Sequence, residues 1–227
     1  MARPRASTYD NQRERILHQA AELFALQGYG GTTMNEVAQA CGVSKAALYH
    51  YVRDKSELLT LIALTHVERL EQLTRDVLAQ ELPAPQRLSE LIRRFVDEYA
   101  GSRHEHRVLT QDVKFLGPQE QHRVVAAQRR VVQAFAAVVC EIRPELAQAG
   151  LHKAVTMLLF GMINWMFTWL RPSGTITHAQ MGDMVAAVFF GGLKAVAAQT
   201  SSNAHAPATA AQSKPSGPAR VRKSKVS

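Results

Sequence analysis

The segment TMNEVAQACGVSKAALYHYV, residues 33–52, contains two short helical patterns separated by a glycine. Thr33 and Glu36 have the spacing of a capping box, in which each side chain bonds the other residue's backbone N–H at the start of a helix. Gly42 is free to adopt the positive φ of a tight turn, and Ser44 is a suitable cap for the helix that follows. The segment therefore predicts a helix, a turn and a second helix.

The flanking residues complete this unit on both sides. An amphipathic stripe precedes it and ends at Gly28, and a second capping pattern, Asp54 to Glu57, begins the next helix. The stripe consists of Ile16, Ala20, Leu23 and Phe24. Three short helices with a tight turn between the second and third are typical of a DNA-binding helix-turn-helix unit.

With these residues in register, the segment from about residue 10 to residue 70 resembles the N-terminal domain of TetR-family transcriptional regulators. Many spaced positions agree rather than one short motif: Ile16, Leu17, Ala20, Ala21, Leu23, Phe24, Gly28, Thr33, Val37, Ala38, Cys41, Gly42, Val43, Ser44, Leu48, Tyr49, Lys55, Leu58 and Leu59. The chain departs from the pattern at Tyr51 and Val52, where many members have His and Phe. The resemblance implies an all-α fold, with an N-terminal three-helix helix-turn-helix domain and a larger C-terminal helical domain for ligand binding and dimerisation.

The sequence divides into four regions. We expect a flexible basic arm at 1–9, a helix-turn-helix domain at 10–57, an effector-binding and dimerisation domain at 58–198, and a disordered basic tail at 199–227. The tail is rich in Ser, Ala, Pro, Lys and Arg and has too few apolar residues to form a core.

The second helix of the motif is the expected reading helix. Lys45 can reach a guanine or a phosphate, and Ala46 offers a methyl group to a thymine. Hydroxyls and amides at helix N-termini favour phosphate, which positions the protein without reading sequence. We therefore expect DNA contacts from Thr33, Ser44, Lys45, Ala46, Tyr49, His50, Tyr51 and Lys55.

The charge of the chain gives weaker support. Its formal net charge is +8 and its pI is about 9.8, which favours a nucleic-acid partner. Five of these net positive charges lie in residues 201–227, however, so the basic pI is mostly a property of the tail. An alternative hypothesis is therefore a ligand-independent architectural DNA-binding protein that binds mainly through its tail.

Two strongly apolar helices are expected in the C-terminal half, near residues 147–170 and 178–198. The first is apolar on nearly all sides, which is typical of a helix buried on two sides. In the family such helices form a dimer interface. A two-fold homodimer would place two reading helices about 34 Å apart on a near-palindromic operator in double-stranded DNA.

The segment GMINWMFTWLRPSG, residues 161–174, is similar to the corresponding helix of TetR-family repressors that sense an acyl-CoA and control fatty-acid, phenylacetate or steroid breakdown. This resemblance implies a repressor of a catabolic operon that an acyl-CoA such as phenylacetyl-CoA releases from DNA. An efflux regulator that senses a hydrophobic drug-like ligand is an alternative. The candidate ligand-binding residues are Arg103, Arg107, Met157, Phe160, Asn164 and Trp165, with further cations at Arg93, Arg94, Arg129 and Arg130.

Other functional classes find little support. There is no phosphate-binding glycine loop and no paired catalytic carboxylates or nucleophile triad, so we expect neither an enzyme nor a cofactor. His104 and His106 do not share a helix face, which argues against a metal site. With two cysteines and no long apolar span, we expect a cytoplasmic, nucleoid-associated protein without a membrane partner.

Overall fold

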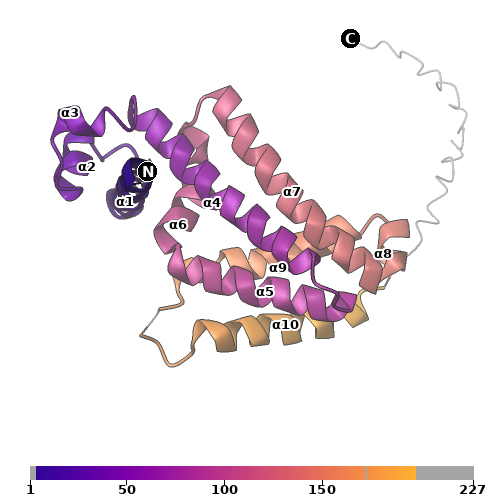
Figure 1. Cartoon of the computed structure of the whole chain (residues 1–227). Helices are drawn as coiled ribbons and strands as arrows, with labels where there is room; N and C mark the ends of the chain where they lie inside the picture. Colours follow the sequence, from indigo (N-terminus) through magenta and orange to yellow (C-terminus); the bar gives the residue numbers. More distant parts are fainter. Residues whose placement is uncertain (1–3, 172, 198–227) are drawn as a thin grey trace, which may run out of the picture.

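The computed structural model describes residues 4–171 and 173–197, and all its regular elements are helices (Figure 1). The all-α prediction is therefore confirmed over the part of the chain that is described. The elements are α1 (Pro4–Gln27), α2 (Met34–Ala40), α3 (Lys45–Leu48), α4 (Lys55–Leu78), α5 (Ala84–Gly101), α6 (Arg103–Gln111), the 3-10 turn η1 (Val113–Phe115), α7 (Pro118–Ile142), α8 (Pro144–Gln148), α9 (His152–Asn164), the 3-10 turn η2 (Met166–Thr168) and α10 (His178–Ala195).

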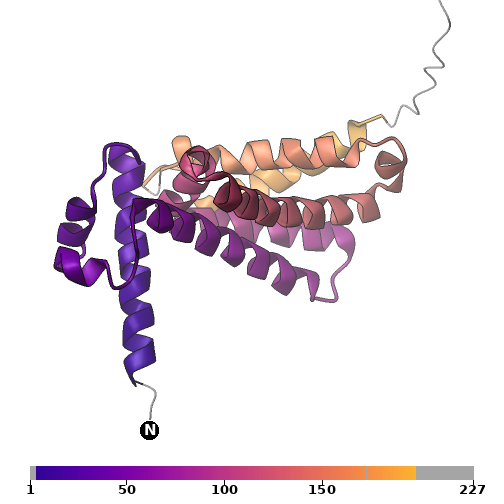
Figure 2. The ribbon, with the colours of Figure 1, turned by 90° about the horizontal axis from the view of Figure 1, so that it is seen from above.

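The helices form two groups joined by α4. Helices α1–α3 form a small head at one end, and α5–α10 form the larger body (Figure 1). The view from above shows α1 running across the direction of α4 and projecting from the body (Figure 2). Helix α4 packs on α5, α6 and α7 in the body and on α1 in the head, and α1 also packs on α6.

Aromatic side chains fill the middle of each group. Phe24 is buried in the head, while Phe95 and Phe135 are fully buried in the body with ring centroids 4.8 Å apart. Phe160 packs against Phe135 at 4.9 Å, which attaches α9 to α7. Within the described residues, no helix is both long and apolar enough to cross a membrane.

The N-terminal prediction needs a correction. Helix α1 begins at Pro4, inside the stretch expected to be a flexible arm, and only residues 1–3 of that stretch lie outside the described residues. Proline suits a helix start because its ring fixes φ and its missing N–H has no helical partner there. The expected boundary after residue 57 also falls inside α4. The predicted tail, 199–227, lies outside the described residues.

The apolar segment 147–170 is not one helix. Gly150 has a φ of 70°, which ends α8, and the Leu151 N–H bonds back to the Leu146 carbonyl. Helix α9 then runs only to Asn164 and is followed by η2. By contrast, α10 begins at His178 as expected, after a capping box between Thr177 and Gln180.

Candidate nucleic-acid interface and ligand cavity

The turn of the head has the local geometry that the sequence predicts. The Thr33 hydroxyl accepts the Glu36 N–H at 3.3 Å, and the Glu36 carboxylate accepts the Thr33 N–H at 2.7 Å. Gly42 has a φ of 65°, and Ser44 caps α3 by accepting the Ala47 N–H at 3.1 Å. Both helix starts are therefore fixed by side chains, and α3 is held in a defined orientation against α2.

Six of the eight predicted DNA contacts lie on the exposed surface of the head. Helix α3 is anchored from beneath by Leu48, which is fully buried. Because Leu48 faces inward, the opposite face of α3 and the turn after it are presented to solvent. The exposed members of the predicted set are Thr33, Ser44, Lys45, Ala46, Tyr49 and His50.

Tyr51 and Lys55 have partners inside the head instead. The Tyr51 ring is half-buried and stacks on Tyr9 of α1, with centroids 4.8 Å apart. The Lys55 ammonium donates to the backbone carbonyls of Tyr29 at 2.8 Å and Thr32 at 2.9 Å, and lies 4.5 Å from the centre of the Tyr29 ring. This differs from the phosphate contact expected for Lys55, because two of its three donors hold the loop between α1 and α2.

The body encloses a cavity of about 550 Å³ between α4, α6, α7 and α9, with Tyr99 of α5 in its wall. Three of the six predicted ligand-binding residues, Met157, Phe160 and Asn164, line it. The other lining residues are Val67, Leu70, Tyr99, His106, Leu109, Thr110, Val125, Gln128, Arg129, Val131, Val132, Gln133, Ala136, His152 and Lys153. A mostly apolar wall with a few polar groups is typical of a small-molecule site.

The remaining three candidates do not line this cavity. Both Nε and Nη2 of Arg103 donate to the Phe167 carbonyl, at 3.0 and 2.8 Å, so this arginine fastens α6 to η2. Arg107 is exposed and donates to Gln111 on its own helix. Trp165, the residue directly after α9, is 65% exposed. Arg103, Arg107 and Trp165 therefore lie outside the wall of this cavity.

A polar wall was missed by the sequence analysis. The Tyr99 hydroxyl donates to Asn164 Oδ1 at 3.0 Å, and the Tyr99 ring stacks on His106 with centroids 3.6 Å apart. His106 Nδ1 lies 3.3 Å from Nε2 of His66. The sequence does contain a signal that His66 is buried. His66 lies four residues after Ile62 and four residues before Leu70, so it occupies a position in an apolar helical stripe.

Burial controls the protonation of the two histidines. Loss of solvent, together with the proximity of His106 and Arg69, lowers the pKa of His66 to about 3. Loss of solvent also lowers the pKa of His106 to about 3, partly opposed by the backbone of Asn164. Both rings are therefore neutral near pH 7.

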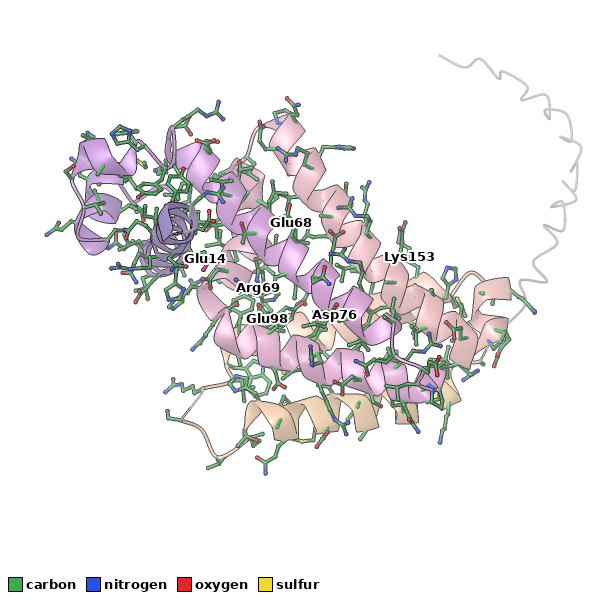
Figure 3. The ribbon with its side chains drawn as sticks, viewed as in Figure 1. Glu14, Glu68, Arg69, Asp76, Glu98 and Lys153 are labelled. Atoms are coloured by element: carbon green, nitrogen blue, oxygen red, sulfur yellow. The ribbon has the colours of Figure 1, made fainter. Side chains whose placement is uncertain are left out.

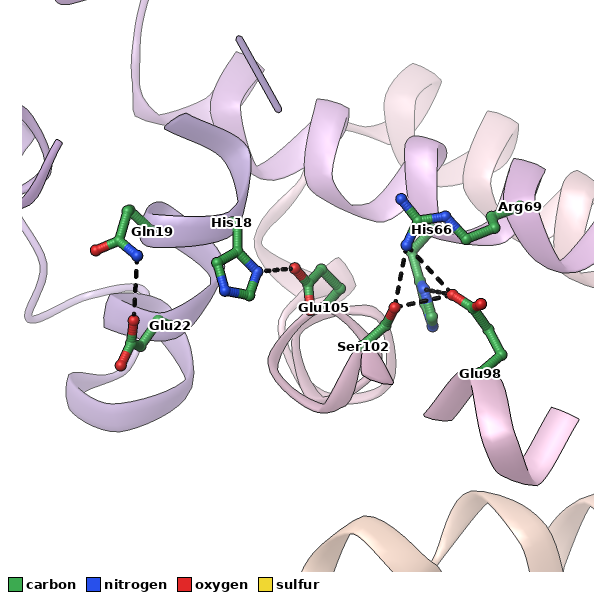
Figure 4. A network of polar contacts seen from close by, with 8 residues as sticks. All are labelled: His18, Gln19, Glu22, His66, Arg69, Glu98, Ser102 and Glu105. Atoms are coloured by element: carbon green, nitrogen blue, oxygen red, sulfur yellow. Dashed lines mark hydrogen bonds and ion pairs between the residues drawn. The ribbon is translucent and has the colours of Figure 1, made fainter. Parts of the chain in front are cut away.

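Two groups of polar contacts lie on either side of α6, one next to this wall and one at the head (Figure 4). Glu98 Oε1 accepts from Ser102 Oγ at 2.8 Å and from Arg69 Nη1 at 3.3 Å, and lies 4.0 Å from His66 Nδ1. Arg69 on α4 and Glu98 on α5 are labelled in Figure 3. On the other side of α6, Glu105 Oε1 lies 2.8 Å from Nδ1 of His18 on α1. Helix α6 thus contacts both the cavity and the head.

Helices α9 and α10 also present an apolar surface outside the cavity, here called the α9–α10 face. Its most exposed members are Leu158, Trp165, Trp169, Met184 and Val188. The last four line one shallow depression. Among the described residues, no group of three or more His, Cys, Asp or Glu side chains is arranged to hold a metal ion.

Replacing Lys55 by Met tests its structural role. Loss of two charge-assisted hydrogen bonds should lower the free energy of unfolding by about 1–3 kcal/mol in urea titrations. The slope of log K for DNA against log salt should stay at the wild-type value. Lys45→Ala is the matched control and should reduce that slope by about 1 with little loss of stability. If Lys55→Met reduced the salt slope as much as Lys45→Ala does, Lys55 would contact a phosphate after all.

The buried histidines predict a pH dependence of stability. Unfolded histidine binds a proton below about pH 6.5, whereas the folded pKa values of His66 and His106 are about 3. Stability is therefore complete above pH 6.5 and falls as the pH drops toward 3, by up to about 1.4 kcal/mol per pH unit for each histidine. Urea titrations at pH 7, 6 and 5 measure this slope. His106→Phe should make it shallower, and an unchanged slope would contradict the assignment.

Two family models match the chain in succession. The model described as bacterial regulatory proteins, tetR family, matches residues 16–62, and the tetracyclin repressor-like C-terminal domain matches residues 81–193. The first match contains the helix-turn-helix, and the second contains most of the residues that line the cavity.

Solved structures and curated proteins agree with these models. A TetR-family transcriptional regulator from Bordetella parapertussis is 32% identical with a TM-score of 0.75, covering 82% of this chain and 97% of that one. AibR, solved in complex with isovaleryl coenzyme A and operator DNA, is 24% identical with a TM-score of 0.68, covering 78% and 97%. The transcriptional repressor KstR2 of Mycobacterium tuberculosis is 23% identical over 198 residues, covering 83% and 96%.

Some curated relatives match over less of their length. The chain spans 37% and 53% of two curated transcriptional regulators that it matches at 40% and 31% identity. The Bordetella regulator, by contrast, is matched almost from end to end. The chain belongs to the TetR family of DNA-binding transcriptional regulators, whose members are regulators rather than enzymes.

Proposed function

We propose that this protein is a homodimeric repressor that a small-molecule effector, an acyl-CoA, releases from its operator. The observation that carries the proposal is the cavity of about 550 Å³ in the body, whose wall includes the helices that contact the head. A ligand bound there can favour one placement of the head over another.

The exposed face of α3 is the proposed reading surface. Lys45 and Ala46 are presented at the start of the helix, where base edges come closest in a major groove. Tyr49, His50 and the N-terminal hydroxyls of Thr33 and Ser44 surround them, in positions suited to phosphate. Tyr51 and Lys55 leave this set, because their side chains support the head from within.

The α9–α10 face is the proposed dimer interface. Its large side chains are 44–68% exposed in the single chain, and Trp165 and Val188 lie in one depression. An exposed cluster of this kind on adjoining helices is typical of an interaction surface. Pairing this face with a second copy about a two-fold axis would present two heads to a near-palindromic operator.

The chemistry of the cavity supports a thioester of coenzyme A. Its wall is apolar around Met157 and Phe160, while Arg129 and Lys153 are exposed at its edge (Lys153 is labelled in Figure 3). An acyl group would occupy the apolar part, and cations at the edge would meet phosphates. AibR, which shares the fold, was solved with isovaleryl coenzyme A.

Helix α6 is the proposed connection between ligand and DNA. Its consecutive residues face in two directions, since His106 lines the cavity and Glu105 contacts His18 of the head. A ligand that moves His106 therefore moves the attachment of α1. DNA affinity falls only in proportion to the ligand's preference for the displaced conformer.

Trp165→Lys should disrupt the dimer. A two-fold interface contains the substitution twice, so a loss of about 2 kcal/mol per site would raise the dissociation constant roughly a thousandfold. Light scattering on a sizing column should then report a monomer. Leu26→Lys is the control, because the Leu26 side chain on α1 is about as exposed as Trp165. This variant should remain dimeric. If the Trp165→Lys variant remains dimeric, the α9–α10 face is not the dimer interface.

Acyl-CoA should release the protein from DNA. With an operator selected from random duplexes by the protein itself, saturating phenylacetyl-CoA or palmitoyl-CoA should raise the apparent Kd at least about tenfold in a gel shift. Free coenzyme A is the control ligand. Glu105→Gln should bind the ester with unchanged affinity in calorimetry but release DNA less, because the contact with His18 is weakened.

Other outcomes would identify the alternatives. Release by hydrophobic dyes but by no acyl-CoA would favour an efflux regulator. Loss of specific binding on deletion of residues 201–227 would favour the architectural protein.

A further inference from the structure

The first turns of α1 project from the head without forming part of its core. Helix α1 begins at Pro4, yet none of the side chains of residues 9–15 is buried, and the core contacts of the helix start at Ile16. At 1.5 Å per residue, about 18 Å of helix precedes Ile16, and this part extends past α2 and α3 in Figure 2. A short helix is marginally stable in water on its own, so the contacts that hold these turns are informative.

One face of these turns points toward the end of the reading helix. Tyr9 and Arg13 are one helical turn apart and share this face, which continues as the buried side of α1 at Ile16. The Tyr9 ring stacks on Tyr51, with centroids 4.8 Å apart and 24° between the ring planes. Tyr51 lies in the turn that follows α3, and Tyr9 remains 45% exposed despite the stack. The stack therefore places the projecting turns of α1 beside the exposed end of α3.

Arg13 gives this face a cation without a carboxylate partner. Its side chain is half-buried, and it forms no ion pair within the described part of the chain, whereas Arg53, just before α4, pairs with Glu57 at 3.2 Å. The acidic residues Asp10 and Glu14 each follow a member of the face by one position, so they are rotated about 100° away from it. A guanidinium with free donors and no counter-charge is suited to binding an anion.

We propose that Tyr9 and Arg13 bind DNA backbone phosphates beside the reading helix and so extend the DNA interface onto α1. This inference rests on the proposed function, because it takes α3 to lie in the major groove. Phosphates border that groove on both sides, and side chains next to the end of a groove-bound helix are close to them. Arg13 supplies charged donors, and the Tyr9 hydroxyl supplies another donor, on a ring that Tyr51 holds in place.

This contact differs from that of the reading helix in its lack of sequence preference. Phosphates carry no base information, so Tyr9 and Arg13 should strengthen binding to an operator and to random DNA alike. The alternative explanation is that the stack of Tyr9 on Tyr51 serves only the stability of the head. The two explanations differ in whether DNA binding changes when a charge or a hydroxyl is removed and the stacked ring is kept.

Salt titrations of DNA binding test the charge. In the full chain, Arg13→Gln should reduce the slope of log K against log salt by about 0.9 per protomer, on random duplex DNA and on a selected operator alike. Arg15→Gln is the matched control, because Arg15 lies about 200° around the same helix and lines the cleft that α1 forms with α4. Its slope should stay at the wild-type value. A wild-type slope in Arg13→Gln, or an equal loss in Arg15→Gln, overturns the proposal.

Tyr9→Phe tests the hydroxyl. The variant keeps the stacked ring, so its urea midpoint should equal that of the wild type, while its Kd for random DNA should rise roughly twofold to tenfold. A Kd equal to that of the wild type overturns the contact of Tyr9 with phosphate. Both measurements on random DNA are independent of operator and effector. If the chain selects no operator but Arg13→Gln still lowers the slope, the proposed repressor is wrong and the α1 contact stands.

Discussion

The structure depends on α4 belonging to both the head and the body. Its first turns place Leu58 and Leu59 in the buried core with α1, and later turns place Val67 and Leu70 in the cavity wall. A helix of 24 residues is about 36 Å long and does not shorten when pushed. The cavity wall and the core of the head therefore share one continuous helix. Lys55 strengthens the junction by attaching the start of α4 to the loop after α1.

The head could be predicted from the sequence because its determinants are local. The capping box at Thr33, the positive φ of Gly42 and the cap at Ser44 each depend on residues within a few positions of one another. Local signals also explain the main errors. The apolar pattern of 147–170 gave no weight to Gly150, although a glycine can adopt a positive φ that a helix cannot continue. The roles of Lys55 and Trp165 depend on contacts or surfaces formed by distant segments, which periodicity does not contain.

The cavity also shows that periodicity in the sequence does not predict contacts between distant segments. Its polar wall joins Tyr99, His106 and Asn164 from three helices, and only the fold brings them together. The sequence does indicate that His66 is unusual, because a polar residue in an apolar stripe must find a partner or remain unsatisfied. It does not indicate which partner. His66 Nδ1 and His106 Nε2 both lie buried without a side-chain hydrogen bond among the described residues.

Helix α6 carries both a residue of the cavity wall and the contact with the head. Apolar side chains such as Met157 adapt to many ligand shapes, so they add affinity without strongly favouring one conformer. A hydrogen bond is strict in distance and angle, so it discriminates between ligands and conformers more sharply than an apolar contact. An effector shifts the equilibrium only as far as its affinities for the two conformers differ. Because His106 is adjacent to Glu105, a residue of the cavity wall lies next to the residue that contacts His18 of the head.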